Sequence, residues 1–299
     1  MRRRQRLKLS VQPHLITAVV VNTLWECSLA LYALGELQPL VVVNLKQHAM
    51  VANLCQELQA GIKQALASAH LAASDLKLLV FATQASLEQG YNGIVFSDNV
   101  LAIADGECPL AATLHESLGI PCYVCNFAYA HLLCLQNSQY LGADSALALL
   151  CGEGSVAMGF FINGKIAFGT NQTFPECSHL PYPYGFECSL GSYTKHTAEA
   201  LLYAIEVLAP IYKHKRVILT GSCFADHPEV IVKAQQALRS SSNSVLNKIQ
   251  LEYWPREIEQ YREELVCLSF TELIDHLNLK SEKRSLATWF AEREQQRGL

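Results

Sequence analysis

Two cysteines spaced as in a redox motif are the first residues of this chain that could do chemistry. Cys122 and Cys125 enclose a Tyr-Val pair, and a Cys-x-x-Cys pair can form a disulfide or bind a metal. The apolar run around them predicts a β-strand, however, in which positions three apart point to opposite faces. We therefore expect two separate thiols without a redox role.

The composition is that of a folded protein without a strong overall charge. Hydrophobic residues make up 51% of the 299 residues, charged residues 17%, and the formal net charge is -4. This balance provides no general attraction to nucleic acid or to anionic membranes. No apolar run suits a signal peptide or a membrane span, and eleven cysteines without a regular framework fit a reducing cytoplasm. We interpret the basic cluster Arg2–Lys8 as a solvated tail, with the end of a linker as the alternative.

Hydrophobic periodicity predicts strands and helices that alternate in two rounds. Three closely spaced apolar runs predict an antiparallel meander, and a second meander begins near residue 145. Strands are expected at Leu15–Val21, Ser28–Leu34, Leu40–Asn44, Leu76–Ala82, Cys122–Cys125, Ser145–Leu150, Val156–Ile162, Lys165–Phe168, Arg216–Thr220 and Ile249–Tyr253. Helices are expected at Val51–His70, Pro109–Leu118, Ala128–Leu141, Thr197–Leu208, Pro228–Ser240, Ile258–Leu265 and Leu286–Gln295. We infer a duplicated α/β protein with room for a ligand between its lobes.

The middle of the chain resembles a known family. A Gly-rich turn, a strand, an Asn-Gly-Lys hairpin and a Glu-x-x-His motif follow one another through Cys151–Gly159, Phe160–Gly169 and Glu176–His179. In order and spacing this run resembles the ROK family of repressors and sugar kinases, and weaker matches extend the resemblance over roughly residues 8–255. The resemblance implies a two-lobed, duplicated actin/hexokinase-like (ribonuclease H-like) α/β fold with a cleft. Residues 1–125 would form the N-terminal lobe and residues 126–299 a shortened C-terminal lobe.

The same resemblance implies that the kinase chemistry is lost. A sugar kinase needs a carboxylate as general base beside the hydroxyl that it phosphorylates. The family carries this Asp in an Asn-Asp pair, which is Asn126-Phe127 here. We therefore assign no catalytic residue.

Both phosphate-binding turns of the family are altered as well. The first, of the type Asp-x-Gly-Gly-Thr, falls near Asn22-Thr23, where no glycine lies. The second keeps Gly152 and Gly154 but places the carboxylate of Glu153 between them, where it would repel phosphate oxygens. We expect a degenerate phosphate loop and no nucleotide cofactor; the two glycines would then only shape a turn.

The sugar-binding positions that the resemblance implies are better preserved. Asn126, Glu176 and His179 match residues that bind sugar hydroxyls in the family, and their side chains can donate or accept hydrogen bonds. An inherited polar network between strand ends would also explain them. The resemblance implies a zinc site with three cysteines, of which this chain retains only one, Cys188. Because zinc needs four ligands, we expect no metal.

The resemblance implies a NagC-like, regulator-type, sugar-sensing protein without kinase activity and, as far as this sequence reaches, without its own DNA-binding domain. Its partners would be a small sugar or sugar phosphate, another protein, and a second copy in a homodimer, with no membrane and no direct contact with DNA. The alternative is an ATP-dependent sugar or amino-sugar kinase. A purely structural module, with its ligand site filled, is a third interpretation.

Overall fold

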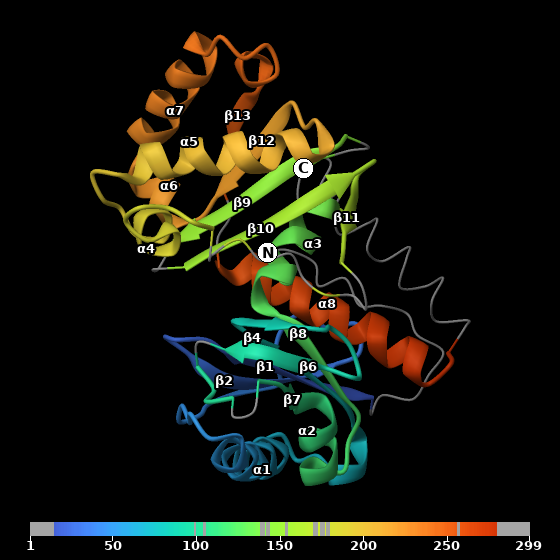
Figure 1. Ribbon diagram of the computed structural model, residues 1–299. Coiled ribbons are helices and arrows are strands. Elements are labelled where there is room, and N and C mark those ends of the chain that lie inside the picture. The colour runs from blue at the N-terminus through green and yellow to red at the C-terminus, as the bar shows by residue number, and fades with distance from the viewer. Residues whose placement is uncertain are drawn as a thin grey trace. The chain divides into compact units, whose positions relative to one another are not determined.

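The chain divides into two compact units. The computed structural model describes residues 15–98, 100–103, 106–137, 141, 144–152, 155–169, 173, 177, 180–255 and 258–279. Of these, the first unit holds the residues from 15 to 131, residue 173 and residues 261–279. The second unit holds those from 132 to 169, residue 177 and those from 180 to 260 (Figure 1).

The first unit is built on a five-stranded sheet with the order β3-β2-β1-β4-β8. Its strands are β1 (Ile16–Asn22), β2 (Cys27–Ala33), β3 (Val41–Asn44), β4 (Leu76–Thr83) and β8 (Cys122–Asn126). The first three pair antiparallel, which confirms the predicted meander, and β4 and β8 continue the sheet in parallel to β1. β1 and β4 are almost wholly buried, because helices cover both faces of this part of the sheet.

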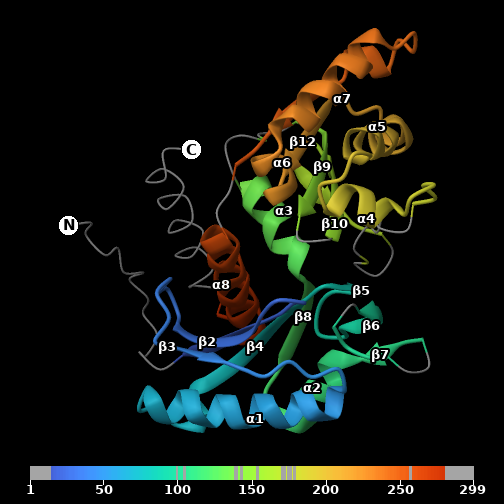
Figure 2. The same ribbon diagram turned by 90° about the vertical axis from the view of Figure 1, so that its left-hand side faces the viewer.

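Helices α1 (Val51–Ser68) and α2 (Leu110–Leu118) lie on one face of this sheet and α8 (Ile258–His276) on the other (Figure 2). α1 buries Leu54, Leu58 and Ile62, which recur at helical spacing. α2 ends where Gly119 takes a left-handed conformation with φ 70°, as glycine does at helix ends.

A small three-stranded sheet follows β4, and the sequence did not predict it. It consists of β5 (Ala85–Leu87), β6 (Ile94–Asp98) and β7 (Cys108–Pro109), with β6 in the centre. Gly90, in the β5–β6 connection, exchanges backbone hydrogen bonds of 2.9 and 3.0 Å with Val124 of β8. The insertion therefore covers the outer edge of the main sheet at β8.

The second unit repeats the same plan in a sheet of order β11-β10-β9-β12-β13. Its strands are β9 (Ala146–Gly152), β10 (Ser155–Ile162), β11 (Lys165–Ala167), β12 (Arg216–Thr220) and β13 (Gln250–Tyr253). Again a meander of three antiparallel strands is extended by two parallel ones. Asn163 and Gly164 form the predicted hairpin turn, with φ 52° and 73°, as a two-residue turn of this kind requires.

Among the described residues, four helices lie wholly in the second unit: α4 (Phe186–Gly191), α5 (Thr197–Leu208), α6 (Ser222–Asp226) and α7 (Pro228–Ser240). The end of α3 (Phe127–Asn137) and the first residues of α8 also belong to it. α3 approaches β10 closely, since a side chain at Gly159 would meet Leu132. The Gln136 amide oxygen also accepts a hydrogen bond of 2.9 Å from the Ile166 amide of β11.

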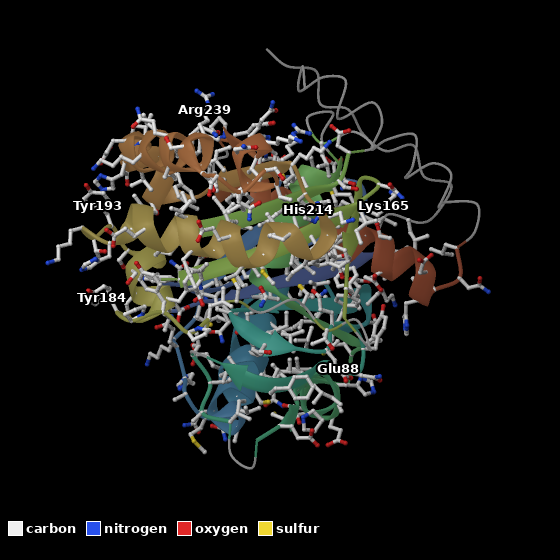
Figure 3. All side chains as sticks on the ribbon, turned by 45° about the horizontal axis from the view of Figure 1, so that its top comes forward. Glu88, Lys165, Tyr184, Tyr193, His214 and Arg239 are labelled. Atoms are coloured by element: carbon white, nitrogen blue, oxygen red, sulfur yellow. The ribbon has the colours of Figure 1, made fainter. Side chains whose placement is uncertain are left out.

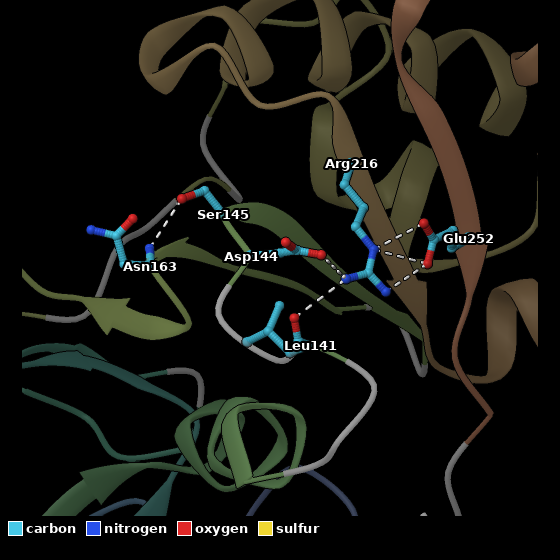
Figure 4. Close-up of polar contacts among 6 residues, drawn as sticks. All are labelled: Leu141, Asp144, Ser145, Asn163, Arg216 and Glu252. Carbon is cyan, nitrogen blue, oxygen red and sulfur yellow. Dashed lines mark hydrogen bonds and ion pairs between the residues drawn. The ribbon is translucent and has the colours of Figure 1, made fainter.

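An ion-pair network joins the parallel strands of the second sheet at their amino ends. The Arg216 guanidinium contacts both carboxylate oxygens of Glu252 at 2.9–3.0 Å. Its Nη1 contacts the Asp144 carboxylate at 3.2 Å and the Leu141 carbonyl at 3.5 Å (Figure 4). The network links β12 to β13 and to the segment before β9. The network lies away from the carboxyl ends of the strands, where ligands of such sheets bind, so we assign it a structural role.

The repeated strand order is the defining feature of the fold. Both sheets place the first strand in the centre, the meander on one side and two parallel strands on the other, which confirms the predicted duplicated α/β fold. The predicted boundary, 125/126, lies near the start of α3, and the division of the structure falls within that helix. Helix α8, predicted in the second lobe, belongs from Tyr261 to the first unit, and the helix expected at Leu286–Gln295 lies outside the described residues. Among the described residues, no helix combines the length and the apolar character needed to cross a membrane.

Candidate functional site

Three polar residues stand side by side where the parallel strands of the first sheet end. Asn22 is the last residue of β1, Thr83 of β4 and Asn126 of β8. The strand register pairs Asn22 with Thr83 and Thr83 with Asn126. Because ligands of open α/β sheets bind at the carboxyl ends of the strands, this row is the candidate site of the first unit.

The side-chain amide of Asn126 makes hydrogen bonds through both its nitrogen and its oxygen. Its Nδ2 donates a hydrogen bond of 2.6 Å to the Ala85 carbonyl of β5, and its Oδ1 accepts one of 2.8 Å from the Ala128 amide. The second bond caps the amino end of α3. Asn126 is half-buried, so it joins three elements and retains a partly accessible side chain.

Asn22 is in the opposite situation. It is 0% exposed, and neither its Nδ2 nor its Oδ1 has a hydrogen-bond partner among the residues that the structure describes. A buried amide without partners is costly. In the second unit the Thr220 hydroxyl, at the carboxyl end of β12, is likewise buried and without a partner in the described part of the chain.

The turn between β1 and β2 uses up all of its own backbone donors. Gly-rich turns hold phosphate through free N–H groups, but here the four amides from Thr23 to Glu26 already donate hydrogen bonds. The acceptors are the Glu26 carbonyl for Thr23 (2.8 Å), the Gln84 amide oxygen for Leu24 (3.1 Å), and the Thr23 hydroxyl for Trp25 and Glu26 (3.4 and 3.2 Å). The turn therefore has no free backbone N–H group for a phosphate.

Comparison with known proteins identifies the architecture. No protein-family profile matches the chain, and no curated protein matches its sequence. Solved structures do match. A ROK-family transcriptional regulator, described as a homologue of the E. coli MLC protein, has a TM-score of 0.67 at 13% identity, covering 93% of this chain and 81% of that one.

Sugar kinases match over a similar extent. The ROK hexokinase from Thermus thermophilus has a TM-score of 0.58 at 15% identity, covering 87% of this chain and 99% of that one. The ROK glucokinase from Streptomyces griseus, solved with glucose and AMPPNP, has a TM-score of 0.56 at 12% identity and covers 85% and 98%. The chain shares its fold with these ROK-family proteins. Regulators and kinases both share it, so the fold alone assigns neither activity.

Within the ROK fold, the residue after Asn126 is aromatic. Phe127 begins α3 and makes an edge-to-face contact with His131 at a centroid distance of 5.4 Å. The His131 ring stacks on Tyr261 of α8 at 3.2 Å, and its two nitrogens are buried without a partner among the described residues. Burial lowers the pKa of His131 to about 3. The imidazole therefore stays neutral and packs as an aromatic ring.

The second Gly-rich turn is described only at its ends. Gly152 lies against the start of α6, because a side chain there would meet the Ser222 hydroxyl and backbone nitrogen. Gly221, with φ 109°, presses in turn against the Cys151 backbone. Both glycines thus allow β9 and the β12–α6 turn to approach closely. Gly154 and Glu153 lie outside the described residues.

Two of the three predicted sugar ligands cannot be placed. Glu176 and His179 lie outside the described residues, whereas Asn126 is placed at the end of β8. Cys177 is buried and Cys188 exposed, and within the described ranges no group of three potential metal ligands occurs. The sequence did not single out Thr83, and it marked Asn22 only as part of the altered first phosphate turn, not as a buried amide without partners.

The Cys122–Cys125 pair has no features of a redox centre. Both thiols are buried in β8. Burial raises the pKa of Cys122 to about 12 and raises that of Cys125 further. Thiols held in the protonated form are poor nucleophiles, in agreement with the expectation that they pack as apolar groups.

Aromatic side chains gather on one side of the second unit. Tyr184 and Tyr193 are 60% and 48% exposed and lie at the surface (Figure 3). Tyr184 stacks on His196 at 3.9 Å, and Tyr193 stacks on His227 at 3.5 Å. Each tyrosine therefore packs one ring face on the histidine that directly precedes α5 or α7.

Proposed function

We propose that this chain is a non-catalytic, regulator-type ROK protein that binds a sugar and does not phosphorylate it. The saturated β1–β2 turn carries this proposal. A nucleotide needs N–H donors that face its phosphates, and all four amides of Thr23–Glu26 have acceptors within the protein. Freeing them would break the turn's own hydrogen bonds.

The residue that follows Asn126 supports the same conclusion. A kinase needs a proton acceptor within hydrogen-bond reach of the sugar hydroxyl. The ROK resemblance assigns this role to the position of Phe127, whose ring instead contacts His131. His131 could not replace the missing base, because its ring is buried and stacked on Tyr261.

The absence of a carboxylate at the end of β1 is a third support. Magnesium ions prefer carboxylate oxygens and accompany nucleotide phosphates in kinases. The resemblance places the first phosphate turn near Asn22-Thr23, where neither residue is an acid, and the neighbouring strands end in Thr83 and Asn126. This row of side chains is neutral and provides little attraction for a divalent cation.

Sugar binding is proposed from the residues that the resemblance preserves. Asn126, Glu176 and His179 would hydrogen-bond sugar hydroxyls, with Asn126 held in place by Ala85 and Ala128. As a regulator-type protein, the chain would act in the cytoplasm through a protein partner, as a homodimer, and without direct contact with DNA through this body.

Isothermal titration tests the proposal. We expect heat on titration with a neutral hexose such as glucose and none with ATP–Mg²⁺. A coupled assay should show no turnover with glucose and ATP. Phe127→Asp should also remain inactive, since a restored base cannot compensate for a turn without free donors. Turnover by the unmodified protein would refute the proposal; turnover by Phe127→Asp alone would refute the argument from the turn.

A further inference from the structure

The amide of Asn22 is the clearest unexplained polar group in the first unit. It lies at the carboxyl end of the central strand β1, is fully buried, and has neither a donor nor an acceptor partner in the described part of the chain. Buried polar groups in folded proteins nearly always have partners, and exceptions often belong to functional sites.

Its neighbours show that the surroundings do not lack hydrogen bonds in general. Asn126 is bonded at both ends of its amide. The Thr23 hydroxyl accepts two backbone hydrogen bonds in the adjoining turn. Thr17, five residues earlier on β1 and equally buried, pairs with the Ser269 hydroxyl of α8 at 3.0 Å. Asn22 is therefore unpaired although these neighbours are bonded.

The charge of the surroundings limits what could bind there. No charged residue occurs in Asn22–Trp25, Thr83–Leu87 or Asn126–Ala130. The next residue of the β1–β2 turn, Glu26, is an anion, and it already pairs with the Arg262 guanidinium of α8. A buried phosphate without a cationic partner would be strongly disfavoured. A neutral hydroxyl can both accept from an amide nitrogen and donate to an amide oxygen, so it matches Asn22 without a charge.

We propose that Asn22 is a ligand-binding residue and that the ligand is an uncharged, hydroxyl-bearing sugar, in preference to a sugar phosphate. The inference rests on the proposed sugar-binding function and adds both a residue and a ligand class to it. The ligand would supply the hydrogen-bond partners that the protein itself does not give to Asn22.

The first test needs no ligand. Asn22→Leu replaces the amide by an apolar side chain of similar size, and it should raise the melting temperature of the ligand-free protein or leave it unchanged, because no hydrogen bond is lost. Thr17→Val is the matched control on the same strand: it removes a hydroxyl that is bonded, and it should lower the melting temperature. If Asn22→Leu is destabilising to a similar extent, Asn22 has a structural partner and the inference is wrong.

The second test measures binding by isothermal titration. The probes are glucose, mannose and sucrose, with glucose 6-phosphate and glucosamine as charged counterparts. We expect the protein to bind a neutral sugar, and Asn22→Leu to weaken that binding by at least about tenfold. Equal affinity of the variant would refute the role of Asn22 while leaving the proposed function intact. Tighter binding of glucose 6-phosphate would refute the ligand class, and absence of any sugar binding would refute the proposed function itself.

Discussion

Arg216 of β12 reaches Glu252 of the parallel strand β13, two residues beyond its register partner Gln250, and the guanidinium binds both carboxylate oxygens at 2.9–3.0 Å. Both side chains are mostly buried, at 18% and 27% exposure. Such a forked, charge-assisted contact is among the stronger polar interactions in proteins. The same guanidinium reaches Asp144, whose side chain is 69% exposed.

The ion pairs of Arg216 with Glu252 and with Asp144 should therefore contribute unequally to the free energy of unfolding. Arg216→Lys removes the fork, and we expect it to lower the free energy of unfolding by about 1–2 kcal/mol. Asp144→Ala removes only the solvated arm and should change it by less than about 0.5 kcal/mol. Urea unfolding of both variants measures the difference. Equal losses would show that the exposed arm matters as much as the buried one.

Gly221 should tolerate no side chain. A methyl group there would meet the backbone of Cys151 in the central strand β9, and the residue has φ 109°. We expect Gly221→Ala to destabilise the protein by about 3 kcal/mol or more, since a strand backbone cannot move aside. Gly119→Ala is the control: its φ is 70° but nothing described lies within 4 Å of the added carbon. It should cost about 1 kcal/mol, as thermal unfolding would show.

Asn126 should stabilise the protein in two separable ways. Asn126→Ala removes the cap of α3 and the bond to Ala85, and we expect a loss of about 1–2 kcal/mol. Asn126→Ser keeps an oxygen that can accept from the Ala128 amide but has no reach to Ala85, so it should recover part of the loss. Chemical unfolding measures both variants. A serine variant as unstable as the alanine variant would show that the cap contributes nothing.

His131 should make stability depend on pH. Its folded pKa, about 3, lies below the ordinary value near 6.5, so only the unfolded chain takes up the proton between these values. Stability is then fully present above about pH 6.5 and falls as the pH drops toward 3, by at most about 1.4 kcal/mol per pH unit. His131→Phe keeps an aromatic ring beside Tyr261 and should flatten this dependence. If the melting temperature of His131→Phe falls toward acid pH as steeply as that of the unmodified protein, His131 is not the group responsible.

The elements that the sequence predicted correctly depend on local chemistry. The Asn163-Gly164 turn and the end of α2 at Gly119 both need positive φ. Asn and Gly adopt positive φ more readily than other residues, so the residue types alone indicate these positions. The bounds of α5, β12 and α7 agree with the prediction, because each combines a clear apolar period with a turn or proline at its end.

The missed elements depend on contacts that are distant in the chain. β5 and β7 have only three and two residues, and β6 lies between them and pairs with both, so each strand depends on its neighbours in the small sheet. α8 continues to His276, whereas the prediction ended at Leu265. The prediction stopped too early because every residue from Glu264 to Phe270 is buried, so this part of the helix has no exposed polar side that would mark a helical period.

The candidate site could be predicted only in part. Motif order led to Asn126, but its structural role depends on Ala85, which lies 41 residues away. The lack of hydrogen-bond partners for the Asn22 amide depends on all the residues that pack around it. No pattern along the sequence could have predicted it. The saturated turn was foreseen only as a turn without glycine; its internal acceptors, such as Gln84, come from another strand connection.

The assignment of α8 to the first unit has a consequence for protein synthesis. The first sheet is complete once β8 leaves the ribosome, but α8, whose Ser269 bonds to Thr17, follows after the whole second sheet. At ordinary translation speeds the interval is roughly 10–30 s. For that time the nascent chain exposes one apolar face of its first sheet, which makes it a natural client for chaperones that shield unfinished domains.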